Sequence, residues 1–215
     1  MTVNLEAALM LETLDGLDSA ESLDAIALMV DHAMDTGDLE LNSRALDWAD
    51  ALETILTADI DLAKLDYYRA NAWANYSKDV RQDRAKAWAW EQESLEQQLL
   101  LLRRALNREA FKDLPILMQC QILTNLGNQL NFAGRFVEAH EFWTRAVDTL
   151  PDFWMAQFNR GYGLMTYARC LYDDGHRYAF ALTAYTDMVD AIRKSSAGGK
   201  LPAPMATQVK CPSLW

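Results

Sequence analysis

The sequence is poor in the residues that build metal sites and disulfide frameworks, with only three cysteines and three histidines among 215 residues. Cys120, Cys170 and Cys211 are far apart and form no CxxC pair, and no histidine stands beside them. We interpret them as reduced thiols, which predicts a cytoplasmic protein rather than a secreted one. The same scarcity favours neither a metal nor a cofactor.

The sequence also lacks long apolar runs. Residues 1–6 show no basic segment followed by an apolar stretch, so no cleaved secretion signal is expected. No stretch reaches the length needed to span a bilayer, so we predict no membrane partner.

Basic residues are the minority charge, because 20 Lys and Arg face 31 Asp and Glu, for a formal net charge of -11. This charge would repel a phosphate backbone unless the basic residues were gathered on one face. A local group of Arg103, Arg104 and Arg108 is interpreted as a solvated helix edge. Direct binding of nucleic acid is therefore disfavoured.

Glycine and proline are scarce before residue 195, and they separate amphipathic segments instead of alternating runs. This pattern predicts an all-α fold, with helices near 4–14, 22–36, 39–57, 61–80, 83–110, 115–133, 136–149, 153–173 and 177–194. Turn signals at 36–38, with Gly37, at 77–82, at 133–135 and at 173–175 divide residues 1–194 into four helical hairpins near 22–57, 61–110, 115–150 and 153–194. Residues 195–215 are rich in Gly, Pro and Ser and are predicted to be a flexible tail.

The third hairpin carries a spaced set of small and large apolar residues, closed by a proline. Its members are Leu123, Leu126, Gly127 and Leu130, then Ala139 and Trp143, then Pro151, with Gly134 between the helices. We expect the small Gly127 and Ala139 to lie where two helices cross closely, and the large residues, Trp143 among them, to fill the gap. This set resembles the 34-residue tetratricopeptide repeat, W-x2-L-G-x2-Y followed by A-x3-F and P. The resemblance implies a right-handed stack of antiparallel helix pairs, an α-solenoid.

The neighbouring hairpins resemble the same unit with insertions. Residues 158–164 parallel residues 124–130, although Gly175 arrives seven residues later than Gly134 would predict. Ala181 and Tyr185 are then expected to repeat the pair formed by Ala139 and Trp143. In the second hairpin residues 69–73 parallel residues 126–130, and the following helix is expected to run long. The first hairpin matches weakly, as terminal repeats do.

The fourth hairpin, residues 155–177, also resembles the repeat region that precedes HEPN domains in some bacterial proteins. HEPN domains are often ribonucleases in which four to six residues separate an Arg from a His. The resemblance implies an alternative function as the sensor or regulatory part of such an RNA-targeting defence or toxin system. No HEPN domain is evident here, so the chain would be a truncated member.

Two pairs in the repeats fit this Arg-to-His spacing, Arg135 with His140 and Arg169 with His176. Motif spacing without domain context arises often by chance. Asp173, together with Asp174 and His176, is interpreted as a turn and helix cap instead of a metal site. No convergent acid, base or nucleophile is found, and we predict that the protein is not an enzyme.

The predicted binding site follows from the resemblance, because the first helix of each tetratricopeptide unit lines the concave surface. Polar residues recur there in the second, third and fourth hairpins, and an amide side chain can both donate to and accept from a peptide backbone. The predicted site residues are Tyr68, Asn71, Asn125, Asn128, Asn159 and Tyr162. Two readings remain open: these residues bind a peptide of another protein, as an adaptor would, or the asparagines bridge adjacent repeats.

Overall fold

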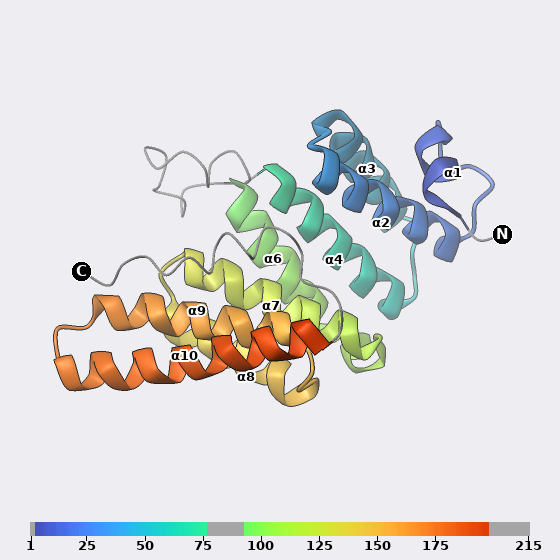
Figure 1. Cartoon of the computed structure of the whole chain (residues 1–215). Coiled ribbons are helices and arrows are strands. Elements are labelled where there is room, and N and C mark those ends of the chain that lie inside the picture. Colours follow the sequence, from blue (N-terminus) through green and yellow to red (C-terminus); the bar gives the residue numbers. More distant parts are fainter. Residues whose placement is uncertain (1–2, 77–92, 198–215) are drawn as a thin grey trace.

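The computed structural model describes residues 3–76 and 93–197, and the described chain is helical throughout, without strands (Figure 1). The all-α prediction is confirmed. The α-helices are α1 (Leu5–Met10), α2 (Ser19–Thr36), α3 (Leu39–Glu53), α4 (Asp59–Tyr76), α6 (Glu93–Asn107), α7 (Ile116–Phe132), α8 (Phe136–Thr149), α9 (Trp154–Cys170) and α10 (Asp174–Ala197). A 3₁₀ helix, η3 (Glu109–Asp113), lies between α6 and α7. None of the helices in the described ranges is long and apolar enough to cross a membrane.

Local residues set the helix ends. Asp18 and Glu21 form a capping box at the start of α2, in which each side chain accepts from the other residue's backbone N–H. Gly37 ends α2 with a φ of 77°, a left-handed conformation that favours glycine, and the Asp38 side chain caps α3. Gly134 turns the chain in the same way between α7 and α8, with a φ of 78°. The turns predicted at Gly37 and Gly134 are confirmed.

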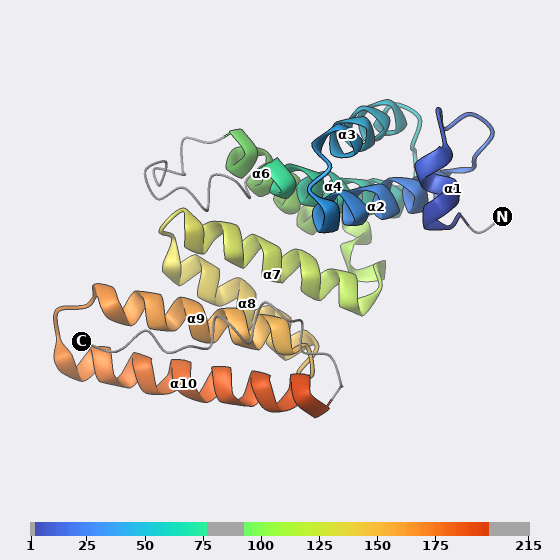
Figure 2. The same ribbon diagram turned by 45° about the horizontal axis from the view of Figure 1, so that its top comes forward.

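The helices pack in pairs: α2 with α3, α4 with α6, α7 with α8, and α9 with α10. Each second helix also packs against the first helix of the next pair, so that α3 meets α4, α6 meets α7 and α8 meets α9. Figures 1 and 2 show the pairs following one another from α1 at one end to α10 at the other. Helix pairing is therefore shown.

Two hydrophobic clusters form the core. One joins α1 to α4 and includes Ile26, Met29 and Leu65, whereas the other runs from α4 to α9 and includes Leu102, Leu126 and Trp143. Tyr68 on α4 packs against both clusters. Helix α4 thus contributes to both clusters and connects them.

Trp143 fills the crossing between three helices. A Cβ added at Gly127 on α7 would lie 2.6 Å from Trp143 Nε1, and one added at Gly163 on α9 would lie 2.2 Å from Trp143 Cζ3. Both glycines are therefore needed for the backbones to approach the indole. Trp143 Nε1 donates to the Thr124 carbonyl at 3.3 Å and to Asn128 Oδ1 at 3.0 Å. The packing role predicted for Gly127 and Trp143 is confirmed.

The predicted alignment of the second helix of the fourth hairpin is wrong. Tyr185 is 62% exposed and Ala181 is half-buried, so this pair does not repeat the packing of Ala139 and Trp143. A Cβ added at Gly161 would instead lie 2.8 Å from the Ala184 carbonyl and 2.9 Å from Met188 Cγ.

The inward-facing series on α10 is the buried Ala184 and Ala191 with the half-buried Met188 between them, which reproduces the spacing of Ala139, Trp143 and Ala146 on α8. The shift of three residues is almost one helical turn, which is why both registers look alike in the sequence. Its cause is that α10 begins at Asp174, so Gly175 lies inside the helix and not between the helices.

Several predicted boundaries also differ from the structure. Helix α1 ends at Met10 and α3 at Glu53, each four residues earlier than predicted. The single helix predicted over 83–110 ends at Asn107, where the chain continues into η3, and residues 83–92 lie outside the described residues. Helix α10 continues to Ala197, beyond the predicted start of the tail at residue 195. The predicted turn near 77–82 and the rest of the tail also lie outside the described residues.

Candidate functional site

The six predicted site residues lie on the first helices of three successive pairs. Helix α4 supplies Tyr68 and Asn71, α7 supplies Asn125 and Asn128, and α9 supplies Asn159 and Tyr162. Five of them are half-buried, and Tyr162 is 58% exposed. Each therefore lies on the first helix of a pair, as predicted, but their contacts differ.

Asn71 and Asn125 bind each other across two helix pairs. Asn125 Nδ2 donates to Asn71 Oδ1 at 3.2 Å, which links α7 to α4. Asn71 also interacts with the Tyr67 side chain through a hydrogen bond, which opposes the rise that burial causes in the pKa of Tyr67. This pair therefore fits the bridging reading, because both amides have a partner inside the chain.

Asn128 is a hydrogen-bond partner of Trp143. Its Oδ1 accepts the 3.0 Å hydrogen bond from the indole N–H, whose other acceptor is the buried Thr124 carbonyl. An indole N–H buried in a core needs such a partner. The acceptor atom of Asn128 is thus used in packing α8 against α7.

Asn159 and Tyr162 are three residues apart on α9, so they share a helix face. Tyr162 leaves its ring accessible to a ligand. Tyr68, by contrast, is wedged between the two core clusters, and burial raises the pKa of its phenol to about 12. Of the six residues, Tyr162 is the one most open to a partner.

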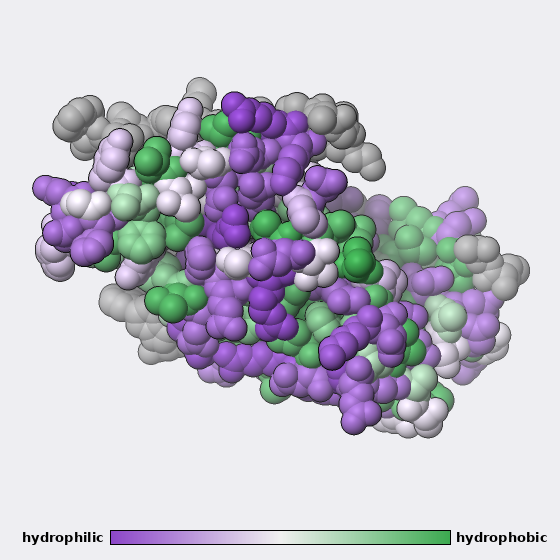
Figure 3. Space-filling model, turned by 90° about the horizontal axis from the view of Figure 1, so that it is seen from below, coloured by the Kyte–Doolittle hydropathy of each residue, from purple (hydrophilic) through white to green (hydrophobic). Residues whose placement is uncertain are grey.

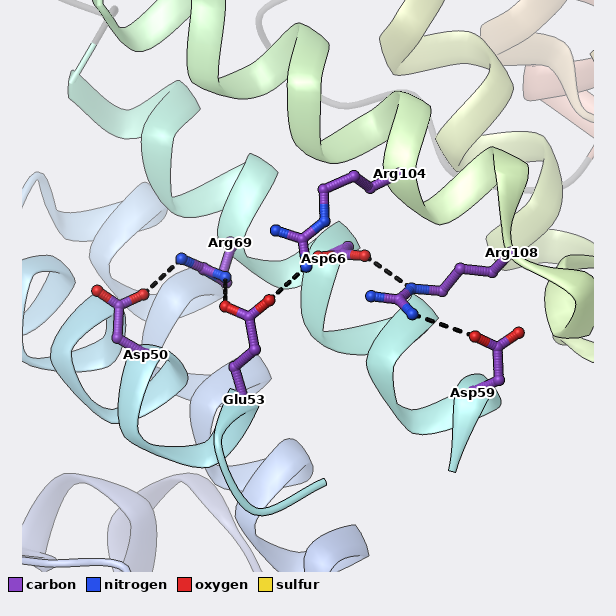
Figure 4. Close-up of polar contacts among 7 residues, drawn as sticks. All are labelled: Asp50, Glu53, Asp59, Asp66, Arg69, Arg104 and Arg108. Atoms are coloured by element: carbon purple, nitrogen blue, oxygen red, sulfur yellow. Dashed lines mark hydrogen bonds and ion pairs between the residues drawn. The ribbon is translucent and has the colours of Figure 1, made fainter. Parts of the chain in front are cut away.

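A charged network joins α3 and α4 to the C-terminal end of α6 (Figure 4). Arg104 binds Glu53 and lies 3.2 Å from Asp66, while Arg108 binds Asp66 at 2.8 Å. The complete network comprises Asp50, Glu53, Asp59, Asp66, Arg69, Arg104 and Arg108, with Arg69 bound to Asp50 and Glu53 and Arg108 bound to Asp59. Four acidic groups thus surround three guanidinium groups.

Asp66 is the buried centre of the charged network, with only 2% of its side chain exposed. Burial raises its pKa, and the adjacent Arg108 and Arg104 oppose that rise. Glu53, which is more exposed, has its pKa lowered mainly by Arg104. The network therefore has a structural role: it links the helices, and each carboxylate has its negative charge compensated by a neighbouring guanidinium.

The interpretation of the α6 arginines as a solvated edge is wrong for Arg104 and Arg108. Arg104 lies on α6 and Arg108 directly follows its last residue, Asn107, and both guanidinium groups meet Asp66 on α4. The matching acids on α4, Asp59 and Asp66, are seven residues apart, about two helical turns. Paired spacings of opposite charge on neighbouring helices were the signal in the sequence that could have revealed this contact.

An open depression of about 370 Å³ lies beside the charged network on α6. It is lined by Leu100, Arg103, Arg104, Asn107 and Arg108. Two of its three guanidinium groups already face carboxylates of the network, and Arg103 lies 4.0 Å from Glu138 on α8. Little positive charge is left there for an anionic ligand.

Of the residues in the two Arg-to-His pairs, Arg135, His140 and His176 make contacts within the fold. Arg135 donates to Glu138 at 2.6 Å, and the half-buried His140 has its pKa lowered first by burial and then by Arg160. Asp173 Oδ1 accepts from the backbone N–H of His176 at 2.7 Å, so the predicted cap at the start of α10 is confirmed. Among the described residues, no group of three or more His, Cys, Asp or Glu is placed to hold a metal ion.

Comparisons of the chain with protein-family models, with curated proteins and with solved structures found no match.

Proposed function

We propose that the chain is a protein-binding adaptor of tetratricopeptide-like helix pairs, which binds a peptide segment of another protein along its first helices. The observation that carries this proposal is one crossing unit that recurs in two successive pairs. Gly127 faces the series built on Trp143, and Gly161 faces the series built on Ala184 and Met188. Stacked units of this kind present extended binding surfaces.

The ligand-binding part of the surface is centred on α9. Tyr162 offers an exposed aromatic ring, and Asn159 one turn earlier offers an amide to a peptide backbone. Two hydrogen bonds hold the neighbouring first helices in place: one joins Asn71 to Asn125, and the other joins Trp143 to Asn128. The formal charge of -11 favours a neutral or basic segment over a nucleic acid.

The proposal is tested by placing a photo-crosslinking amino acid at Tyr162 and, in a matched variant, at the exposed Glu141 of α8. In host cells we expect a covalent adduct to one protein from position 162 and none of that species from position 141. Asn159→Ala/Tyr162→Ala should then weaken binding of the purified partner by about tenfold, the cost of roughly 1.4 kcal/mol. The same adducts from both positions would overturn the assignment of the surface.

The identity of the adduct also tests the alternative function. A HEPN-containing protein captured through Tyr162 would make the chain the sensor of a ribonuclease system, with the same binding surface. Any other protein would favour a general adaptor.

A further inference from the structure

Helix α2 presents three exposed carboxylates on one face. Asp24, Asp31 and Asp35 are separated by seven and four residues, so they follow one another along the same side of the helix. Residues 1–61 hold 15 of the chain's 31 acidic residues but only one of its 20 basic residues, Arg44. This end of the molecule therefore has little positive charge of its own to place beside them.

The α2 carboxylates differ in this respect from those of the charged network, where every acid lies against a guanidinium. Within the described part of the chain, Asp24, Asp31 and Asp35 form no ion pair. Lys64 on the neighbouring helix α4 is bound to Asp61 at 3.3 Å. Although Asp31 is exposed, partial desolvation raises its pKa, and the negative charge of Asp35 raises it further. A bound cation would relieve this repulsion.

The acidic face of α2 borders the first-helix surface of α4. Burial raises the pKa of the Tyr68 phenol, and the nearby charges of Asp24 and Asp31 add to the rise. Tyr68 shares its side of α4 with Asn71 and Asn75, which follow it by three and seven residues. The three acids thus lie at one end of the surface formed by the first helices α2, α4, α7 and α9.

Asn75 supplies a buried hydrogen-bond acceptor at this end. Its side chain is 95% buried, because the residue is only 5% exposed. Its Nδ2 donates to the Val30 carbonyl at 3.3 Å and to Asn42 Oδ1 at 2.8 Å. Because the amide is planar, Oδ1 points away from both acceptors and thus away from Asn42 on α3. This oxygen has no hydrogen-bond partner in the described chain, and Val30 directly precedes Asp31. A buried acceptor of this kind calls for a donor.

One chemical group answers both the charge and the acceptor. A Lys ammonium or an Arg guanidinium is positively charged and carries only donors, so it can bind carboxylates and an amide oxygen together. Apolar burial gives a partner less to recognise on the face seen from below, where separate apolar patches are set among polar side chains (Figure 3). Charge complementarity therefore selects a basic partner.

We propose that the peptide segment bound along the first helices is basic, with a Lys or Arg side chain held by Asp31, Asp35 and Asn75 where α2 meets α4. This inference rests on the peptide-binding proposal and adds a polarity to it. Neighbouring helix axes are about 8–10 Å apart, so α4 and α9 are separated by roughly 20 Å across α7. An extended chain covers that distance in about six residues, so the basic residue lies about six to nine residues from the one that contacts Tyr162.

The probe is a library of random twelve-residue peptides, selected on the full chain. We expect the selected peptides to be enriched in Lys and Arg. A labelled copy of one of them should bind Asp31→Asn/Asp35→Asn at least tenfold more weakly, as measured by fluorescence anisotropy. The control Glu141→Gln/Asp148→Asn removes the same two charges from exposed positions on α8 and should bind within about twofold of wild type.

A double-mutant cycle separates local contact from general attraction. Replacing the basic residue of the peptide by Gln should weaken binding to wild type about tenfold and binding to Asp31→Asn/Asp35→Asn less than twofold. Equal losses with both proteins, or selected peptides without Lys or Arg, would overturn the basic segment. If those peptides still lose affinity for Asn159→Ala/Tyr162→Ala, the adaptor surface itself stands.

The opposite failure has a different result. If no selected peptide depends on Asn159 and Tyr162, the peptide-binding surface is wrong, and the basic segment proposed for it falls as well.

Discussion

At the scale of single residues, the indole of Trp143 sets the distance between three helices. Gly163 has no side chain to move aside, and a methyl group there would overlap the indole ring at 2.2 Å. Because a packed core resists added volume, we expect Gly163→Ala to lower the free energy of unfolding by about 1–3 kcal/mol. The measurement is urea unfolding followed by circular dichroism.

The matched control for this substitution is Gly175→Ala, at an exposed position in the first turn of α10. Its added methyl group would lie 3.2 Å from the side-chain oxygen of Asp173, an atom that can move. Its effect should stay below about 0.5 kcal/mol. Equal losses from both variants would show that Gly163 does not lie against Trp143.

Because Asp66 is ionisable, the stability contributed by its partner Arg108 should depend on pH. Arg108→Met removes its 2.8 Å partner and leaves a buried carboxylate less compensated, so we expect the variant to lose about 3 kcal/mol at pH 7. Burial already raises the pKa of Asp66 in the folded state, and losing Arg108 raises it further. The penalty applies to the ionised form, so it disappears as the pH falls through that raised pKa.

The measurement is the difference in unfolding free energy between wild type and Arg108→Met, at pH 7 and near pH 4. The difference should shrink at the lower pH. Loss of the contact between Arg108 and Asp59 has the same sign, because Arg108 helps to lower the pKa of Asp59. Arg103→Met is the control, since Arg103 is exposed and outside the charged network. A difference that is the same at both pH values would contradict a buried, ionised Asp66.

At the scale of helices, the register of α10 can be tested by adding volume on two neighbouring faces. Ala184 is fully buried against Gly161, so Ala184→Leu should cost about 1–3 kcal/mol. Ala181→Leu adds the same atoms one turn away, at a half-buried position, and should cost clearly less. Thermal unfolding of both variants measures the difference. The reverse order would restore the register predicted from the sequence.

These helices also show how far the sequence leads. Gly37 and Gly134 marked two turns because their backbone needs a left-handed conformation, which only a few residue types adopt readily. Gly175 has no such conformation, so it was a false turn signal and shifted the alignment of α10. Apolar periodicity could not correct the error, because a shift of three residues keeps nearly the same helix face.

The candidate site was predicted less completely than the fold. The sequence placed the asparagines on the first helices, but an amide can bind a ligand or another amide equally well. Only the contact between Asn71 and Asn125 shows which use applies to that pair. Arg104 and Arg108 were missed because their partners on α3 and α4 are 38 to 51 residues away in sequence.

At the scale of the whole molecule, the two core clusters meet on one helix, and Tyr68 touches both. Each helix pair packs mainly on its neighbours, so the cooperativity of such a chain depends on the contacts between adjacent units. We expect wild type to unfold in one transition, because α4 is shared. Tyr68→Ala leaves a cavity where the two clusters meet, so it should lower the free energy of unfolding by about 3 kcal/mol and separate the transition into two.

Hydrogen exchange at increasing urea concentration can resolve the two halves. In wild type the amides of α2 and those of α7 should lose protection at the same urea concentration. In Tyr68→Ala, α2 should lose protection first, because its cluster lacks the packing that α7 receives from α8 and α9. Tyr162→Ala, at an exposed ring on α9, is the control and should keep a single transition. If α2 and α7 still open together in Tyr68→Ala, the coupling between the clusters passes through other contacts of α4, such as those with α6.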